Sequence, residues 1–189
     1  IHFTMDDNPS LSESVKKRYK SLYSGAFYER FIEGKWVTAQ GLVYPMFSPE
    51  RHIKMHEGGF SRYYLSCDYG TVNPFSLGLW GECDGKWYRL DEYYYSGRDN
   101  GIQLTDEEYY RELERLANGK DITALIIDPS AASFIQTVLR HKKFRVIKAN
   151  NDVLSGINRV CQALKDGEIF IYPCCADAIR EFSIYRWDD

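Results

Sequence analysis

The chain has 189 residues, of which 44% are hydrophobic and 15% aromatic, enough to build one globular unit with a substantial core. Its 24 basic and 27 acidic residues give a net charge of −3, which excludes the overall electropositive surface of a constitutive nucleic-acid binder. Any polyanion must therefore be met by a local basic patch.

Cysteine usage and hydropathy limit the environment of the protein. The five cysteines are odd in number and two are adjacent, which suits neither a disulfide framework nor a zinc site with separated ligand pairs. We therefore expect reduced cysteines in an intracellular protein. No segment approaches the roughly 20 apolar residues that span a bilayer, and the start has neither an initiator Met nor a signal-peptide pattern. We expect a fragment of a longer protein that does not contact membranes.

The first fifty residues predict an arm more than a core. Residues 8–36 have a helical pattern that is basic on one side, broken at Gly25, and provided with aromatic side chains for docking. We therefore expect residues 1–50 to be a linker or arm whose helices pack on a domain formed by residues 51–189.

Three sequential antiparallel strands are predicted next. Residues 63–69 alternate between two faces with the period of a strand, and Asp68 stands inside this otherwise uncharged run. Residues 75–82 form the second strand, and the Asp-Gly pair at Asp84 predicts a hairpin turn into a third strand at 87–95.

Helices then alternate with strands. Thr105 and Glu108 predict a capping box that begins a helix, and the next apolar run, 124–128, has the character of a parallel strand buried on both faces. That strand ends with Asp128, before Pro129. The later elements are a helix at 131–139, a strand at 144–148, a helix at 153–164, a strand at 168–172 and a helix at 176–185.

The element order is β-β-β-α-β-α-β-α followed by a β-α appendage, which is the order of the ribonuclease H-like fold. This α/β fold has a mixed central sheet, in which three antiparallel strands are followed by parallel strands, flanked by helices. Its first and fourth strands are central neighbours. We therefore expect Asp68 and Asp128 to lie side by side although they are 60 residues apart.

Two adjacent carboxylates repel each other by about 1 to 4 kcal/mol, so they either share a proton or hold a cation. Oxygen ligands favour Mg²⁺ or Mn²⁺ over zinc, and paired divalent ions catalyse phosphodiester hydrolysis. We therefore predict a nuclease in which Asp68 and Asp128 are catalytic and bind two ions of Mg²⁺ or Mn²⁺. Each residue alone also has an ordinary explanation, because aspartate is common at strand ends and before proline.

Other acidic and histidine residues are weaker candidates. Asp91 and Glu92 lie on opposite faces of a predicted outer strand, where a solvated face is the simpler interpretation. His52 and His56 have the spacing of a metal pair, but they lack an accompanying carboxylate motif and sit among strand breakers. We expect them on a surface loop.

Five basic residues could contact DNA phosphates, because such contacts need cationic side chains without sequence readout. Arg98 lies in a glycine-containing loop, and the others bracket a helix end and a strand: Lys142, Lys143, Arg145 and Lys148. For Lys142 and Lys143 the alternative is stabilisation of the dipole at a helix C-terminus.

The chain also carries, in order, FTMDDNPSL, YSGAFYERFIEGKWVTAQGLVYPMF, SCDYGTVNPF, LIIDPSAASF, GINRVCQALKDGEIFIYPCC and EFSIYRW. Together these stretches resemble the nuclease half of tailed-phage terminase large subunits, and most closely the group that includes the SPP1-type packaging proteins. The resemblance covers nearly the whole chain.

The resemblance implies a metal-dependent headful nuclease that cuts concatemeric double-stranded viral DNA, with little sequence dependence, at the start and end of packaging. It also implies an ATPase motor, a small terminase subunit and a portal protein as partners, and a location in the host cytoplasm. The phosphate-binding motif GxxxxGK[ST] of such a motor does not occur in this sequence, so we expect the motor to be absent from this chain. By position, Asp68 matches the family's first-strand metal ligand and Asp128 the acid after its fourth strand. The family's third acid lies on a helix that we expect beyond Asp189, and Asp188 and Asp189 are expected to be solvated.

Two alternatives belong to other classes. The stretch CDYGT also fits the first phosphate-binding turn of an actin-like or sugar-kinase-like phosphotransferase lobe, although Pro129 removes a backbone donor that a second phosphate turn would use. The other alternative is a non-catalytic ribonuclease H-like module that binds DNA or a partner protein, which the retention of both strand-end aspartates disfavours.

Overall fold

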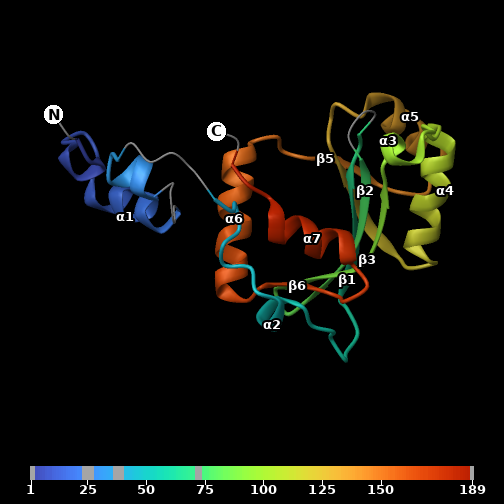
Figure 1. The fold of residues 1–189 in the computed structure, drawn as a ribbon, viewed down its shortest axis with the longest axis horizontal. Helices are drawn as coiled ribbons and strands as arrows, with labels where there is room; N and C mark the ends of the chain where they lie inside the picture. Colours follow the sequence, from blue (N-terminus) through green and yellow to red (C-terminus); the bar gives the residue numbers. More distant parts are fainter. Residues whose placement is uncertain (1–2, 23–27, 36–40, 71–73, 188–189) are drawn as a thin grey trace. The chain divides into compact units, whose positions relative to one another are not determined.

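The computed structural model describes residues 3–22, 28–35, 41–70 and 74–187 (Figure 1). Contacts group the chain into two compact units. The smaller unit comprises Ile1–Phe47, Asp152–Asp166 and Glu181–Asp189, and the larger comprises Ser48–Asn151 and Gly167–Arg180. Because units defined by contacts are not necessarily domains, the division into 1–50 and 51–189 stays a prediction.

The larger unit contains a six-stranded sheet with the order β5-β4-β1-β2-β3-β6. The strands are β1 (Arg62–Asp68), β2 (Phe75–Cys83), β3 (Lys86–Tyr95), β4 (Ile122–Ile127), β5 (Val146–Lys148) and β6 (Ile169–Ile171). The first three pair antiparallel, whereas β4 runs parallel to both β1 and β5. The ribonuclease H-like order predicted from the sequence is therefore confirmed, with β1 and β4 adjacent at the centre.

The predicted hairpin and capping box are both present. Asp84 and Gly85 have φ angles of 52° and 74°, the left-handed values that a two-residue hairpin turn between β2 and β3 requires. At the start of α4 (Asp106–Ala117), Thr105 accepts a hydrogen bond from the Glu108 backbone, and Glu108 Oε2 accepts one from the Thr105 backbone at 2.7 Å. These local signals fix where the sheet turns and where the first covering helix begins.

Helices α4 and α5 (Ala132–His141) pack together beside the sheet, as Figure 1 shows. The core lies between them and one face of β1, β2 and β4, because alternate strand residues point to that face. Its fully buried members include Leu65, Leu77, Leu113, Leu125 and Phe134. The opposite face of the sheet carries Tyr64, Ser66 and Asp68, which alternate with the core residues of β1.

Three elements of the larger unit differ from the prediction. The short helices α2 (Pro49–His52) and α3 (Gly97–Asn100) were not predicted, because four residues carry too little periodicity. Strand β6 is part of the sheet and not an appendage, since it pairs in parallel with the start of β3. The next helix, α7 (Ala176–Ile184), begins in the larger unit and ends in the smaller one.

The smaller unit contains η1 (Met5–Asp7), α1 (Glu13–Leu22), η2 (Tyr28–Ile32) and α6 (Val153–Asp166). A small core is formed by Val43, Ile157 and Cys161, with Trp187 packed against it. The break predicted at Gly25, and Trp36 at the end of the predicted helical stretch, lie outside the described residues. In the described part of the chain, no helix has both the length and the apolar character needed to cross a bilayer.

Candidate active site

The two predicted aspartates lie at the carboxyl ends of the adjacent parallel strands β1 and β4. Cys67 pairs with Ile127 in the register of β1 and β4, and the next residue on each side is an aspartate, Asp68 and Asp128. Neighbouring strands lie about 4.8 Å apart, so the two backbones are that close. Because Cys67 and Ile127 are buried in the core beneath α4 and α5, both aspartates lie on the opposite face.

Hydrogen bonds give the two carboxylates different electrostatic environments. The Ser130 backbone N–H donates to Asp128 Oδ1 at 2.7 Å. Hydrogen bonds from the Ser130 side chain and backbone, and a further one from the Asn151 side chain, lower the pKa of Asp128. At Asp68 partial desolvation, followed by the negative charge of Asp128, raises the pKa above its ordinary value. The pair therefore holds one firmly ionised carboxylate and one that gains most from an added cation.

The donor set suits a hard divalent cation that keeps part of its water shell. Two carboxylates on one face supply oxygen ligands only. Among the described residues, no group of three or more His, Cys, Asp or Glu side chains is arranged to hold a metal ion. Asp188 and Asp189, for which a solvated position was predicted, lie outside the described residues. The two aspartates thus form the candidate metal centre.

Arg98 lies at the same edge of the sheet as the carboxylates. Strand β3 runs parallel to β1, because both are antiparallel to β2, and its last residue, Tyr95, pairs with Phe75 at the start of β2. The exposed Arg98 follows in α3. Its prediction as a phosphate contact therefore fits the position of the candidate metal centre.

The other four predicted basic residues lie around β5 and the end of α5. Lys148 pairs with Ile127, which places it at the carboxylate edge but on the core face of the sheet. Lys142 follows α5, a helix of ten residues that is about 15 Å long and begins beside Asp128. Lys143 forms an ion pair with Glu114, with 3.1 Å between Nζ and Oε1, and the exposed Arg145 precedes β5. Of these four, Lys148 lies nearest the site in register.

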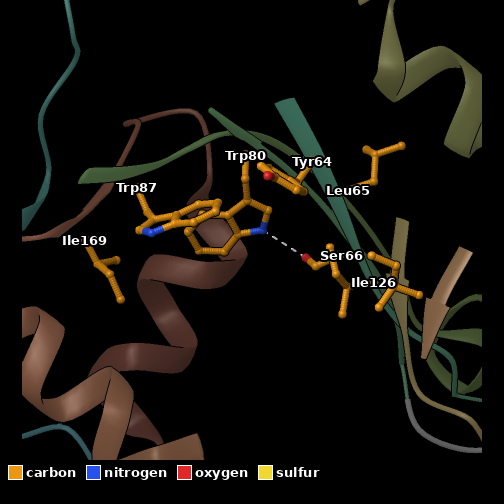
Figure 2. A pocket seen from close by; sticks show the side chains of 8 residues that line it. Tyr64, Leu65, Ser66, Trp80, Trp87, Ile126 and Ile169 are labelled. Carbon is orange, nitrogen blue, oxygen red and sulfur yellow. Dashed lines mark hydrogen bonds between the residues drawn. The ribbon is translucent and has the colours of Figure 1, made fainter. Parts of the chain in front are cut away.

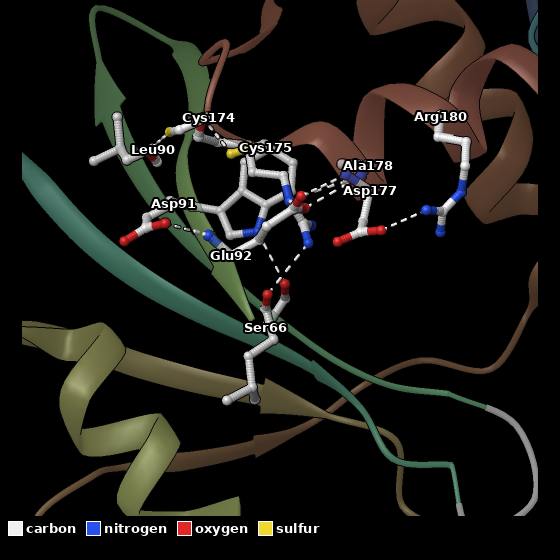
Figure 3. Close-up of polar contacts among 12 residues, drawn as sticks. Ser66, Leu90, Asp91, Glu92, Cys174, Cys175, Asp177, Ala178 and Arg180 are labelled. Carbon is white, nitrogen blue, oxygen red and sulfur yellow. Dashed lines mark hydrogen bonds and ion pairs between the residues drawn. The ribbon is translucent and has the colours of Figure 1, made fainter. Parts of the chain in front are cut away.

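Glu92 has a structural role that the sequence interpretation missed. Its side chain is only 7% exposed and lies on the same sheet face as Asp68, not on a solvated outer strand as predicted. Figure 3 shows Glu92 directed at the start of α7, where the backbone N–H of Asp177 donates to Oε1 at 2.7 Å and that of Ala178 to Oε2 at 3.2 Å. The buried carboxylate therefore anchors α7 to the sheet.

Arg89 and Gly78 complete this polar network. Arg89 Nε lies 3.3 Å from Glu92 Oε2, and its guanidinium lies 5.5 Å from the centre of the Trp80 ring. Trp80 Nε1 donates to Ser66 Oγ at 2.9 Å. A Cβ atom at Gly78 would come within 2.7 Å of Arg89 Nη1 and 2.9 Å of Ser66 Oγ, so a larger residue at this position would force one of these side chains to shift.

An apolar groove of about 470 Å³ occupies the same face, farther from the strand ends (Figure 2). Its walls include Tyr64, Trp80, Trp87, Ile126, Ile147 and Ile169. Among the described residues that line it, the one polar side chain besides the Tyr64 hydroxyl and the indoles is Ser66, whose oxygen already accepts from Trp80. Its lining, as far as the chain is described, includes neither Asp68 nor Asp128, so the groove is distinct from the candidate metal centre.

Among the described residues, neither His52 nor His56 belongs to a group of three or more potential metal ligands. His52 is 1% exposed, and the Ser48 backbone N–H donates to its Nδ1 at 3.0 Å. The His56 ring packs 5.2 Å from Phe60 and 5.1 Å from Tyr88, measured between ring centres. The surface-loop prediction was therefore wrong for His52, and the hydrogen bond to Nδ1 offsets part of the cost of burying its ring.

No family model matches the chain. The large terminase of the thermophilic bacteriophage D6E, which was also solved with ADP and with ATP-gamma-S, is 48% identical over 100% of this chain and 47% of its own, with a TM-score of 0.82. The curated terminase large subunit of Escherichia phage T5 is 20% identical over 199 positions, which cover 100% of this chain and 44% of the T5 protein. The chain thus spans about half the length of these relatives.

The large terminase nuclease of thermophilic phage G20c, solved with bound zinc and also with bound cobalt, is similar in fold alone. The zinc form is 12% identical, covers 77% of this chain and 88% of its own, and has a TM-score of 0.56. The chain thus covers most of the G20c nuclease structure but only about half of the D6E large terminase structure. This chain is therefore similar in sequence to one part of a phage large terminase, and it has the fold of a large terminase nuclease.

Proposed function

We propose that the chain is a divalent-metal-dependent endonuclease that cuts concatemeric double-stranded viral DNA during genome packaging, at initiation and at headful termination. The observation that carries the proposal is the placement of Asp68 and Asp128 at adjacent strand ends on one face of the sheet. Carboxylate pairs in this arrangement are suited to phosphodiester hydrolysis, for which the metal-containing G20c nuclease supplies a precedent on the same fold.

Asp68 and Asp128 would hold the metal, and their oxygen ligands favour Mg²⁺ or Mn²⁺. Two divalent ions would supply an activated water and charge neutralisation at the leaving oxygen. Within the chain, the hydrogen bonds from Ser130 keep Asp128 ionised and oriented. Desolvation and the charge of Asp128 raise the pKa of Asp68, and a bound cation would offset both effects.

The proposed partners follow from the relatives. D6E large terminase is a longer chain solved with adenine nucleotides, which supports an ATPase motor that acts with the nuclease part. A small terminase subunit and a portal protein would complete the packaging machine in the host cytoplasm. With a net charge of −3, the nuclease part alone should bind DNA weakly at physiological salt, so delivery by the motor would raise its local DNA concentration.

Cleavage of supercoiled plasmid tests the proposal. The chain and the complete natural gene product that carries it are incubated with Mg²⁺, with Mn²⁺ and with a chelator, and nicked and linear products are separated on a gel. Metal-dependent nicking and linearisation support the nuclease. Phosphoryl transfer that requires ATP, or DNA binding without cutting in every metal, would instead favour the phosphotransferase lobe or the non-catalytic module.

A further inference from the structure

A row of three paired residues runs from the candidate metal centre across the sheet. Asp68 pairs with Ser76, and Ser76 pairs with Tyr94, so the three side chains share one face. Two strand spacings separate Asp68 from Tyr94, a distance of about 10 Å. Along double-stranded DNA this distance corresponds to about three nucleotides of axial rise in one strand.

Arg180 lies above the far end of this row. Its guanidinium carbon is 5.2 Å from the centre of the Tyr94 ring, and its Nη1 donates to Asp177 Oδ1 at 2.6 Å. The side chain nevertheless keeps 47% of its surface exposed. A guanidinium therefore faces solvent on the same side of the sheet as Asp68 and Asp128, and from there it can reach a ligand that extends past the carboxylates.

The start of α7 holds this arginine in place. Glu92 accepts hydrogen bonds from the first-turn N–H groups of Asp177 and Ala178, and the ion pair with Arg89 fixes Glu92 in turn. Figure 3 shows this chain of contacts from the sheet to Asp177 and Arg180. The position of Arg180 is thus set by the same sheet that carries the two aspartates.

We propose that Arg180 contacts a DNA backbone phosphate a few nucleotides from the one that lies at Asp68 and Asp128. The proposal rests on the function proposed above. A polyanion that approaches two carboxylates needs cations nearby, and the planar guanidinium binds phosphate oxygens through paired hydrogen bonds. The ion pair with Asp177 is exposed and therefore weak, so it does not prevent this contact.

The chain contains a matched control for this residue. Arg115 on α4 also pairs with a carboxylate three residues earlier, with 2.7 Å between Nε and Glu112 Oε2, and it also lies over a tyrosine, 6.0 Å from the ring centre of Tyr93. Its side chain is 64% exposed. Tyr93 and Tyr94 are neighbours on β3 and point to opposite faces, so Arg115 lies on the face away from the aspartates.

The test measures binding of a fluorescent 30-base-pair duplex to the chain in a chelator, by anisotropy at several salt concentrations. Arg180→Gln is expected to weaken binding about tenfold at low salt and to reduce the slope of log K against log salt by about 0.9, the effect of one lost phosphate contact. Arg115→Gln should leave both quantities at the parent value. Equal slopes for the two variants would overturn the proposal.

Two further variants separate the causes. Arg180→Lys keeps the charge, so the slope of log K against log salt is expected to equal that of the parent. A slope as low as that of Arg180→Gln would instead assign the weaker DNA binding to altered packing of α7 and overturn the proposal. Asp68→Asn should bind DNA at least as tightly as the parent but lose metal-dependent cutting.

The results also distinguish the phosphate contact from the nuclease function. If the parent never cuts DNA but Arg180→Gln still weakens binding, the nuclease function fails and the phosphate contact stands. If the parent cuts and both arginine variants bind alike, only the contact fails.

Discussion

Asp68 and Asp128 end the two central parallel strands on the same face, one register step beyond the paired residues Cys67 and Ile127. This relationship depends on the order of the strands, because the two aspartates are 60 residues apart in the sequence. It also gives them unlike environments, since Asp128 is stabilised as an anion by Ser130 while Asp68 is destabilised by desolvation and by Asp128.

The raised pKa of Asp68 makes stability depend on pH in a defined direction. The folded state binds this proton more tightly than the unfolded chain does, so protonation of Asp68 stabilises the folded state. This stabilisation is complete at acid pH and is lost as pH rises through the pKa of Asp68 in the folded state. In a chelator at pH 7, Asp68→Asn should therefore be more stable than the parent, by a small amount because the exposed side chain is screened by solvent. Urea unfolding from pH 3.5 to pH 7 should show this advantage shrinking towards acid pH.

A divalent cation should stabilise the folded chain by binding both carboxylates. At a Mg²⁺ or Mn²⁺ concentration of about 100 times Kd, the expected gain is about 2.7 kcal/mol, which raises the melting temperature by several degrees. Differential scanning fluorimetry measures the shift. The double variant Asp68→Asn, Asp128→Asn should show none, and an equal shift in parent and double variant would place the metal elsewhere.

The sequence was sufficient to predict the strands that position this site. Alternation in β1, the hairpin signal at Asp84 and the capping box at Thr105 are local patterns, and each formed where it was predicted. Their order then brought β1 beside β4, because the ribonuclease H-like arrangement leaves few other pairings. The adjacency of Asp68 and Asp128 therefore followed from patterns that extend over only a few residues each.

The residues that surround the site could not be predicted in the same way. The burial of Glu92 depends on contacts with Asp177 and Ala178, 85 and 86 residues later, which no local period encodes. His52 is similar, since its burial follows from tertiary packing around a four-residue helix. A glutamate directly before three tyrosines in a strand gives no signal that a distant helix will begin against it.

Glu92→Gln should destabilise the chain by about 3 kcal/mol, because it leaves the buried Arg89 guanidinium without its charge partner and weakens the hydrogen bonds to α7. Asp91→Asn, one residue earlier and exposed, is the control and should change stability by less than about 0.5 kcal/mol. Urea denaturation compares the two, and equal midpoints would contradict an anchoring role for Glu92.

Two glycine substitutions should act in opposite directions. Gly78→Ala forces a Cβ against Arg89 and Ser66, both held by other partners, and should cost about 1 to 3 kcal/mol. Gly156→Ala meets nothing within 4 Å on α6 and should stabilise the chain by about 0.5 to 1 kcal/mol through helix propensity. Melting temperatures that move in the same direction would show that the network around Gly78 can adjust to the added atom.

The rate of metal-dependent plasmid cleavage by aspartate variants tests the central claim most directly. The parent, Asp68→Asn and Asp128→Asn are compared with Asp121→Asn, whose carboxylate lies at the other end of β4, in the 189-residue chain and in the complete natural gene product. Loss of a metal-ligating carboxylate should reduce the rate at least about 100-fold in both site variants, whereas Asp121→Asn should cut like the parent. Undiminished cutting by both Asp68→Asn and Asp128→Asn would contradict the account.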